Sequence, residues 1–310
     1  MKIHDNYNSF KVQRPVITSG VFDGVHLGHQ EILKRVIDVA SSVKGESVVV
    51  TFWPHPREVL KKDDSLKLIN SIEEKLELLE KYGIGHVVLI PFTPEFSKLS
   101  SKEYISDILV TKLHVSNLII GYNHHFGHDR LGDFDQILQY AATYKFTAKL
   151  LTPISINNVN ISSTLIRKAL QDGDIETANK YLGYQYQLSG NVIVGNKIGR
   201  TIGYPTANVK VSHNFKIIPK PGVYAIWVKI EHTLYPAMLN IGFRPTLNET
   251  TPHLSIEAHI IGFQGDIYGK EITLFFQSRI RDEVKFSGLD QLTKQLDNDK
   301  EEVNKILGVK

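Results

Sequence analysis

Two histidines stand three positions apart in the segment GVFDGVHLGHQ, residues 20–30, between an apolar run and an amphipathic one. Such a glycine-rich stretch predicts a turn between a strand and a helix. The first turn of a helix offers unpaired backbone N–H groups and a partial positive charge, which together bind phosphate. His26 and His29 point the same way from that turn and can donate further hydrogen bonds to the same phosphate.

Other interpretations of this segment stay open. The spacing His-x-x-His also suits a metal ion, although we can name no third ligand, and two surface histidines would give the same pattern. The glycines match neither the dinucleotide fingerprint G-x-G-x-x-G nor the P-loop pattern. The segment alone therefore indicates an anion site without identifying a reaction.

A second cluster lies in NISSTLIRKAL, residues 160–170. Ser162, Ser163 and Thr164 precede a predicted helix, where hydroxyls cap the first turn and can also donate to an anion. Arg167 follows on the same helix, and its guanidinium can grip phosphate oxygens in a fork. By itself this is an ordinary capping motif. Phosphate binding is favoured because the cluster occurs in the same chain as residues 20–30, hereafter the histidine turn.

The elements that must position these residues alternate along the first half of the chain. Short apolar runs predict strands at 14–20, 47–53, 86–92, 116–121 and 146–154. Apolar residues recurring on one face predict helices at 28–43, 71–82 and 133–145. This alternation is typical of a parallel sheet with helices on its faces. Ligands bind such sheets at the carboxyl ends of the strands.

The pattern changes near residue 183, after a helical region at 173–183. Strand-like runs then follow one another, at 186–195, 222–230, 233–242, 253–263 and 271–280. Successive strands punctuated by Gly, Pro and Asn indicate an antiparallel barrel or sandwich. A helix with one apolar stripe is predicted at 288–307. We expect two packed domains, 1–184 and 185–310.

Composition narrows the class of protein. The formal charge of +3 over 310 residues is too small to make nucleic acid the main partner. The absence of cysteine excludes disulfides, thiolate metal sites and a cysteine nucleophile, and it fits a reducing compartment. We find no apolar signal core and no apolar run near 18 residues. We expect a cytoplasmic protein without a membrane partner, either a monomer or a weak homo-oligomer.

Several motifs, taken together and in order, resemble one family. H-x-G-H at 26–29 with I-S-S-T-x-I-R at 161–167 is similar to the nucleotidylyltransferase superfamily. TFWPHP (51–56) and GYNHHFG (121–127) resemble the adenylyltransferase module of bifunctional bacterial riboflavin kinase/FAD synthetases. GRTIGYPTANV (199–209) resembles the riboflavin kinase signature, and PGVYA, NIGFRPT and SIEAHI follow it in the family's order.

The resemblance covers essentially the whole chain. It implies an α/β N-terminal domain, a Rossmann-like nucleotidylyltransferase domain with a parallel sheet and flanking helices. It also implies a C-terminal antiparallel β-barrel riboflavin kinase domain with a terminal helix. Riboflavin, FMN and ATP would be the small-molecule partners, with Mg²⁺ or another divalent cation as cofactor.

The first half would transfer AMP from ATP to FMN, giving FAD and pyrophosphate. Because the FMN phosphate is already an anion, this reaction needs charge neutralisation rather than a base. By resemblance, the catalytic residues are His26, His29 and Arg167. The expected contacts to ATP or phosphate are Gly20, Phe22, Gly24, Gly28, Asn123, Ser162, Ser163 and Thr164. The expected flavin contacts are Phe52, Pro54 and His55.

Some of these residues keep a second interpretation. Asn123 is equally typical of a turn. Asp23 either organises the glycine-rich loop or meets Mg²⁺. PHP at 54–56 is otherwise a stiff turn.

The second half would phosphorylate riboflavin with ATP, giving FMN and ADP. Its acceptor is the neutral ribityl 5′-hydroxyl, so a general base helps. The resemblance places that base at Glu257. In LSIEAHI, apolar residues alternate with Ser255, Glu257 and His259, which puts Glu257 on the polar face of a strand, toward either solvent or a pocket.

The loop PTAN would support this base. Thr206 and Asn208 offer oxygen ligands to Mg²⁺. Gly203 would allow a close approach to phosphate. Arg200 would contact phosphate, although it is also typical of a solvated charge.

Two other functions compete with the bifunctional enzyme. Only one half could be active, or the chain could be a flavin-binding sensor without turnover. Motifs are intact in both halves, and a sensor would be expected to lose His26, His29 or Glu257. The sequence therefore favours two activities.

Overall fold

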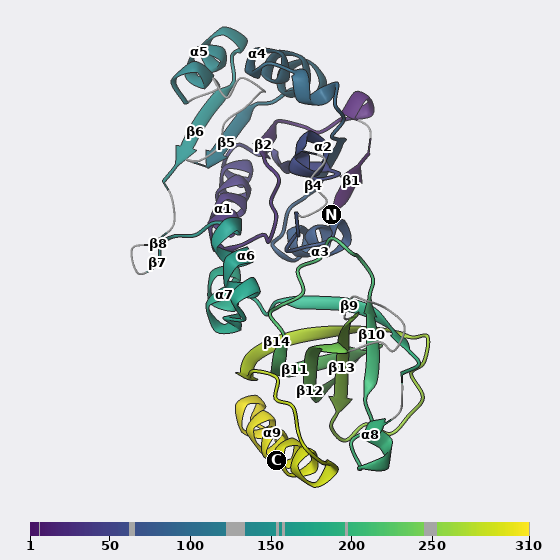
Figure 1. Cartoon of the computed structure of the whole chain (residues 1–310). Helices are drawn as coiled ribbons and strands as arrows, with labels where there is room; N and C mark the ends of the chain where they lie inside the picture. Colours follow the sequence, from purple (N-terminus) through teal and green to yellow (C-terminus); the bar gives the residue numbers. More distant parts are fainter. Residues whose placement is uncertain are drawn as a thin grey trace. The chain divides into compact units, whose positions relative to one another are not determined.

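The computed structural model describes residues 1–5, 7–61, 66–121, 134–152, 155–156, 159–195, 198–244 and 253–309 (Figure 1). Contacts between Cα atoms divide the chain into two compact units, Met1–Ser163 and Thr164–Lys310. The expected domains 1–184 and 185–310 were drawn where the sequence pattern changes, near residue 183, and their boundary stays a prediction. Each unit has a fold of its own.

Unit 1 (1–163) contains a parallel sheet in the order β1-β4-β3-β2-β5-β6. Its strands are β1 (Lys2–His4), β2 (Pro15–Ser19), β3 (Glu46–Trp53), β4 (His86–Pro91), β5 (Asn117–Gly121) and β6 (Thr147–Leu151). The central strands are buried along their length because helices cover both faces. The predicted parallel sheet is confirmed. β1 is an additional edge strand, too short and too exposed to show an apolar pattern.

Helices cover both faces of this sheet. α1 (Leu27–Ser42) buries Val36 and Ala40 against one face. The π-helix η3 (Tyr104–Lys112) and α5 (Phe134–Tyr144) cover the other face. The other described elements of unit 1 are η1 (Tyr7–Ser9), α2 (Pro56–Lys61), α3 (Ile72–Lys81), η2 (Phe96–Lys98), α4 (Ser101–Glu103), β7 (Ser155–Ile156) and β8 (Val159–Asn160). Periodicity did not predict η3, because its wider turns move apolar residues off the 3.6-residue repeat.

The sheet has a topological switch point at β2. This strand pairs with β3 on one side and with β5 on the other. The chain leaves β2, forms α1 and enters β3, and only later crosses to β5. Open parallel sheets bind ligands where the strand order reverses in this way. The segment that follows β2 is the histidine turn.

Unit 2 (164–310) is built on a closed antiparallel barrel in the order β10-β13-β12-β11-β14-β9. Its strands are β9 (Gln187–Ile193), β10 (Ala207–Val211), β11 (Gly222–Ile230), β12 (Thr233–Arg244), β13 (His253–Ile260) and β14 (Glu271–Arg281). Tyr224, Leu239 and Phe276 are fully buried and fill the barrel. Of the two architectures open for this half, the barrel is correct. β10 was absent from the predicted strands because PTAN resembles a hairpin loop.

Four helices accompany the barrel within the described part of unit 2. They are α6 (Ser163–Asp172), α7 (Ile175–Leu182), α8 (Ile198–Thr201) and α9 (Leu289–Leu307). α9 confirms the predicted terminal helix and packs Val303 against Ala225 and Met238 on the outside of the barrel wall. The same cluster contains Tyr204, which precedes β10.

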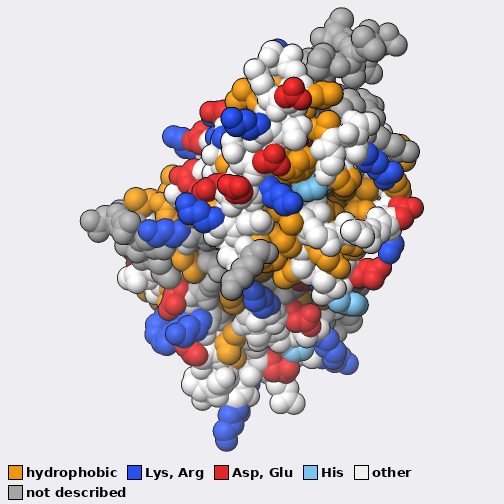
Figure 2. Space-filling model, turned by 90° about the horizontal axis from the view of Figure 1, so that it is seen from below, with side chains coloured by type: hydrophobic (Ala, Val, Ile, Leu, Met, Phe, Trp, Pro, Cys, Tyr) orange, Lys and Arg blue, Asp and Glu red, His pale blue; other side chains and the backbone are white. Residues whose placement is uncertain are grey.

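The surface carries charges of both signs. Figure 2 shows Lys and Arg side chains interspersed with Asp and Glu over the face that it draws, in keeping with the net charge of +3. Among the residues described, no helix has the length and apolar character that a bilayer crossing requires.

Candidate active sites

The first candidate site is the turn after β2. Phe22, Gly24 and Val25 have φ angles of 51°, 88° and 33°, which lie in the left-handed region. Phe and Val adopt such angles at a cost in free energy, so contacts from the surrounding structure must impose them. The residue between them, Asp23, makes those contacts.

Asp23 is fixed at both its side chain and its backbone. Its buried carboxylate accepts hydrogen bonds from the N–H groups of Ile69 (3.0 Å) and Asn70 (3.2 Å), just before α3. Its carbonyl accepts a 2.8 Å hydrogen bond from Oγ of Ser163. Of the two roles open for Asp23, these contacts support organisation of the loop.

The turn delivers His26 to the N-cap of α1. The Nδ1 atom of His26 accepts a 3.4 Å hydrogen bond from the backbone N–H of His29. Neutral His26 therefore carries its proton on Nε2, which is able to donate to a ligand. The two imidazole rings stack with centroids 3.7 Å apart, and Phe22 packs against His29 at 4.9 Å. His26 and His29 were expected to point the same way. Their rings do so, as a stacked pair at the N-terminus of α1.

Three glycines permit this arrangement in different ways. A Cβ atom on Gly28 would lie 3.2 Å from the His26 ring, and one on Gly20 would lie 3.2 Å from the Phe22 ring. Both positions therefore need a small residue for packing, whereas Gly24 is needed for its positive φ.

The hydroxyl cluster leads into α6. Ser162 is half-buried, α6 begins at Ser163, and Thr164 is exposed on its first turn. Ser163 is brought to the histidine turn by its hydrogen bond to Asp23. Thr164 and the half-exposed Arg167 fall in unit 2, and their roles stay predictions. The predicted ligand Asn123 lies outside the described residues.

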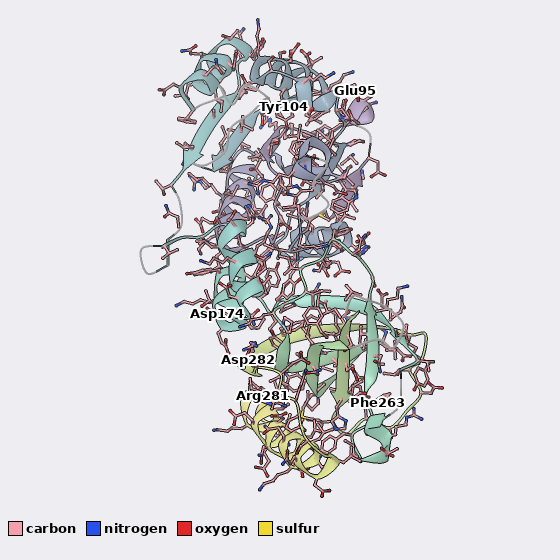
Figure 3. The ribbon with its side chains drawn as sticks, viewed as in Figure 1. Glu95, Tyr104, Asp174, Phe263, Arg281 and Asp282 are labelled. Carbon is pink, nitrogen blue, oxygen red and sulfur yellow. The ribbon has the colours of Figure 1, made fainter. Side chains whose placement is uncertain are left out.

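The expected flavin contacts follow the end of β3. Phe52 is buried, and its ring lies 5.8, 5.7 and 6.4 Å from those of Phe92, Phe96 and Tyr104, the last labelled in Figure 3. Pro54 is exposed. The Nδ1 atom of buried His55 accepts a 3.1 Å hydrogen bond from the N–H of Arg57 at the start of α2. These side chains thus have structural contacts of their own, and their contact with flavin stays a prediction.

The second candidate site lies on the outer face of the barrel wall. Glu257 on β13 is directly opposite Asn208 on β10 and Asn240 on β12. Directly opposed residues project on the same face of a sheet, and all three are half-buried. The Oγ1 atom of Thr206 donates to Oε2 of Glu257 at 3.4 Å. The residues on either side of Glu257 are buried, which confirms the predicted alternation.

Two side chains hold the loop that carries Thr206. The Nδ1 atom of His259 lies 2.9 Å from the carbonyl oxygen of Pro205, and burial lowers the pKa of His259, so the neutral ring donates Nδ1–H. The hydroxyl of Tyr204 donates to Asp297 of α9. Burial, followed by the bond to Asp297, raises the pKa of Tyr204 to about 12, so this hydroxyl stays a donor. Glu257 therefore faces a loop held from both β13 and α9.

The remaining predicted contacts lie around α8. Gly203 has a φ of 81° and open space beside it. Arg200 is exposed, and its Nη2 atom lies 3.2 Å from the hydroxyl of Tyr268. A Cβ atom on Gly195 would lie 2.2 Å from Nδ2 of Asn208, so the chain passes this amide closely. The phosphate roles of Arg200 and Gly203 stay predictions.

Sequence reasoning assigned no function to Tyr204, Asn240 or His259. Asn240 lies in NIGFRPT, and His259 lies two residues after Glu257 on the polar face. Their places beside Glu257 are set by strand register and by α9, which no local pattern contains. In both units, the described residues contain no cluster of three or more His, Asp or Glu suited to a metal ion.

Comparison with known proteins assigns each half of the chain to a family. The family model of FAD synthetase matches residues 10–165, and that of riboflavin kinase matches residues 182–307. A bifunctional riboflavin kinase/FMN adenylyltransferase from Buchnera aphidicola is 36% identical over 92% of this chain and 90% of its own length. The chain belongs to this bifunctional family.

A second member of the family and a solved structure are also similar to nearly the whole chain. The bifunctional riboflavin kinase/FMN adenylyltransferase of Listeria monocytogenes is 36% identical over 93% of this chain and 90% of its own length. A crystal structure described as a macrolide-efflux protein from Streptococcus pneumoniae is 30% identical, with a TM-score of 0.88 over 96% of this chain and 97% of that one. The histidine turn lies within the FAD synthetase match of this bifunctional protein, and Glu257 lies within the riboflavin kinase match.

Proposed function

We propose that the two activities of this chain, riboflavin kinase and FMN adenylyltransferase, work at two separate sites. The kinase makes FMN from riboflavin, and the adenylyltransferase makes FAD from that FMN. The observation that carries the proposal is that each unit holds one cluster suited to one reaction. Unit 1 has hydrogen-bond donors at a helix N-terminus, and unit 2 has a half-buried carboxylate beside oxygen ligands.

In the adenylyltransferase reaction, an oxygen of the FMN phosphate attacks the α-phosphorus of ATP and pyrophosphate leaves. Negative charge grows on the leaving phosphates as that bond breaks. His26 and His29 donate to these oxygens, and the N-terminus of α1 adds its partial positive charge. Ser162, the residue before α6, adds its hydroxyl, and the contacts of Thr164 and Arg167 with the rest of the triphosphate stay predictions from the resemblance.

In the kinase reaction, Glu257 accepts the proton of the ribityl 5′-hydroxyl as its oxygen attacks the γ-phosphorus of ATP, and ADP leaves. Glu257 is suited to this because it is a half-buried carboxylate, and the hydrogen bond that Thr206 donates to it holds it in position. His259 and Tyr204 position the loop, since they hold the backbone next to Thr206. Arg200 reaches the phosphates from α8.

A divalent cation fits the kinase site. Thr206, Asn208 and Glu257 bring a hydroxyl, an amide and a carboxylate to one part of the barrel wall, and Mg²⁺ prefers such oxygen ligands. Thr206 and Asn208 would hold the ion, which when bound neutralises charge on the ATP phosphates. The proposal places the activities at 1–184 and 185–310 and the protein in the cytoplasm.

Isotopic labelling tests the assignment of reactions. The protein is incubated with riboflavin, Mg²⁺ and ATP labelled at either the α- or the γ-phosphorus, and flavins are separated by chromatography over time. We expect γ-label in FMN and FAD and α-label in FAD only, with FMN appearing first. Label from the α-position in FMN, or FAD formed without pyrophosphate, would refute the two reactions as written.

A further inference from the structure

Lys75 is a buried cation that neither proposed reaction uses. It lies on α3, and 2% of its surface is exposed. Burial of an ammonium group is costly unless an anion or a π-system compensates it. Lys75 is in the same unit as the histidine turn, and its burial therefore requires groups nearby that stabilise the positive charge.

Two neighbours compensate the charge of Lys75. Its Nζ atom lies 5.8 Å from the centroid of the Trp53 ring, at the end of β3, which is a cation–π distance. The carboxylate of Asp23 is the charged group among the described residues that stabilises its ammonium form. Glu74, beside Lys75 on the helix, is directed to the N–H of Ser71 and the amide of Asn70. Burial outweighs Asp23 and lowers the pKa of Lys75 to about 8.

Asp23 connects this cation to the site. Its carboxylate holds the backbone before α3, and its carbonyl receives the hydroxyl of Ser163. On either side of it, Phe22 and Val25 are in the left-handed region, and His26 follows as the N-cap of α1. Asp23 is itself 3% exposed, so as a carboxylate it needs a nearby positive charge. Lys75, on α3, provides such a charge.

We propose that Lys75 is a positioning residue for adenylyl transfer, whose buried ammonium balances the Asp23 carboxylate and so fixes the turn that presents His26 and His29 to ATP. This inference rests on the proposed function of the histidine turn. It extends the site to α3. When Lys75 loses its proton, Asp23 keeps its backbone donors but loses the positive charge of Lys75, and the strained turn relaxes.

The charge, rather than the shape, of residue 75 is what this role requires. Lys75→Arg keeps a positive charge that does not titrate below pH 12. Lys75→Met keeps the length and apolar stem without the charge. Because Lys75 is active in its protonated form and its pKa is about 8, the wild-type adenylyltransferase should lose rate as the pH rises through that value.

The experiment compares the three proteins between pH 6.5 and 9.5, with adenylyl transfer from supplied FMN and riboflavin phosphorylation measured on the same samples. We expect Lys75→Arg to match the wild type near pH 7 and to exceed it by about tenfold one pH unit above the pKa, in line with a single required proton. Lys75→Met should lower kcat/KM for FMN by about 10- to 100-fold near pH 7, the usual effect of a small misplacement of catalytic groups. The kinase rate should not change.

The outcomes distinguish failure of the role proposed for Lys75 from failure of the function proposed for the histidine turn. Superimposable pH profiles for the wild type and Lys75→Arg would overturn it, as would a fully active Lys75→Met or an inactive Lys75→Arg with wild-type thermal unfolding. If Lys75→Met does not fold, the comparison of the wild type with Lys75→Arg still decides. A wild type that phosphorylates riboflavin but never adenylylates FMN would instead refute the function proposed for unit 1.

Discussion

The two proposed sites of this chain differ in their construction, although both reactions transfer a phosphorus-containing group from ATP. In unit 1 the site is a strained turn and a helix N-terminus, held together by contacts between residues far apart in the chain, such as Ser163 with Asp23. In unit 2 the site is a row of opposed side chains on regular strands, in which Glu257 stands between Asn208 and Asn240. One site consists mainly of donors, and the other centres on a carboxylate.

The difference between the sites follows from the two groups that accept the transferred phosphorus, the FMN phosphate and the ribityl hydroxyl. A phosphate is already anionic, so the adenylyltransferase site needs positive charge and donors and gains nothing from a carboxylate. A ribityl hydroxyl must lose a proton, so the kinase site needs a base. A helix terminus at a switch point provides the first, and the polar face of a barrel strand provides the second.

Removal of the base should give the largest effect. Glu257→Gln keeps the shape of the side chain but cannot accept the ribityl proton, and we expect the kinase kcat to fall by about 10²–10⁴-fold. Adenylyl transfer from supplied FMN should be unchanged. Glu271→Gln, at an exposed position of β14, is the matched control and should alter neither rate. A normal kinase kcat in Glu257→Gln would show that Glu257 is not the general base.

Removal of a donor should have the next largest effect, confined to the other activity. His29→Ala takes away one hydrogen-bond donor and the stacking partner of His26, so adenylyl transfer should fall by about 10²–10³-fold. FMN formation from riboflavin, followed by chromatography, should continue at the wild-type rate. If both activities fell together, the sites would not be independent.

Loosening the turn should cost less than loss of a donor. Ser163→Ala removes the 2.8 Å hydrogen bond to the Asp23 carbonyl. A loss of about 0.5–1.5 kcal/mol corresponds to a two- to twelvefold fall in kcat/KM for adenylyl transfer. Ser97→Ala removes a similar bond, from Oγ of Ser97 to the Pro94 carbonyl at 2.7 Å, and serves as the control. Equal effects of the two variants would show that Ser163 contributes stability alone.

The smallest effect is expected from loss of the hydrogen bond between Tyr204, in the loop that carries Thr206, and Asp297 of α9. Tyr204→Phe removes the hydrogen bond to Asp297, and we expect unit 2 to lose about 1 kcal/mol in urea unfolding, with a less than threefold rise in KM for ATP. Since the pKa of Tyr204 is raised to about 12, the change should be independent of pH from 6 to 9. A variant with wild-type stability would mean that α9 does not hold this loop.

Sequence patterns predicted the fold better than the sites. The apolar runs of β2 to β5 were predicted because both faces of the sheet are covered there, and α9 was predicted because one of its stripes is buried. β10 and η3 were not predicted. A short half-exposed strand shows no clear alternation of apolar residues, and a π-helix does not follow the 3.6-residue repeat. The flavin contacts and the kinase base were named only by resemblance to a family, whereas the histidine pair and the cluster around Arg167 were recognised as candidate anion sites from their spacing.

What the sequence could not give is the set of contacts that holds those residues in place. Asp23 and Ser163 are 140 positions apart, and the partners of Tyr204 and His259 are set by α9 and by loop geometry. His26 and His29 were predictable as a pair because helix geometry alone directs them to one side. Lys75 shows no signal at all, because its burial depends on how α3 meets β3 and the turn.

The claim that the chain holds two independent sites is tested most directly by mixing two inactivated proteins. His29→Ala and Glu257→Gln are incubated alone and together with riboflavin, ATP and Mg²⁺, and FAD is measured over time. We predict that His29→Ala stops at FMN, that Glu257→Gln makes almost nothing, and that the mixture makes FAD because FMN released by one protein is adenylylated by the other. A mixture that accumulates FMN without FAD, although Glu257→Gln converts supplied FMN, would contradict free transfer between the sites. Failure of Glu257→Gln to convert supplied FMN would contradict their independence.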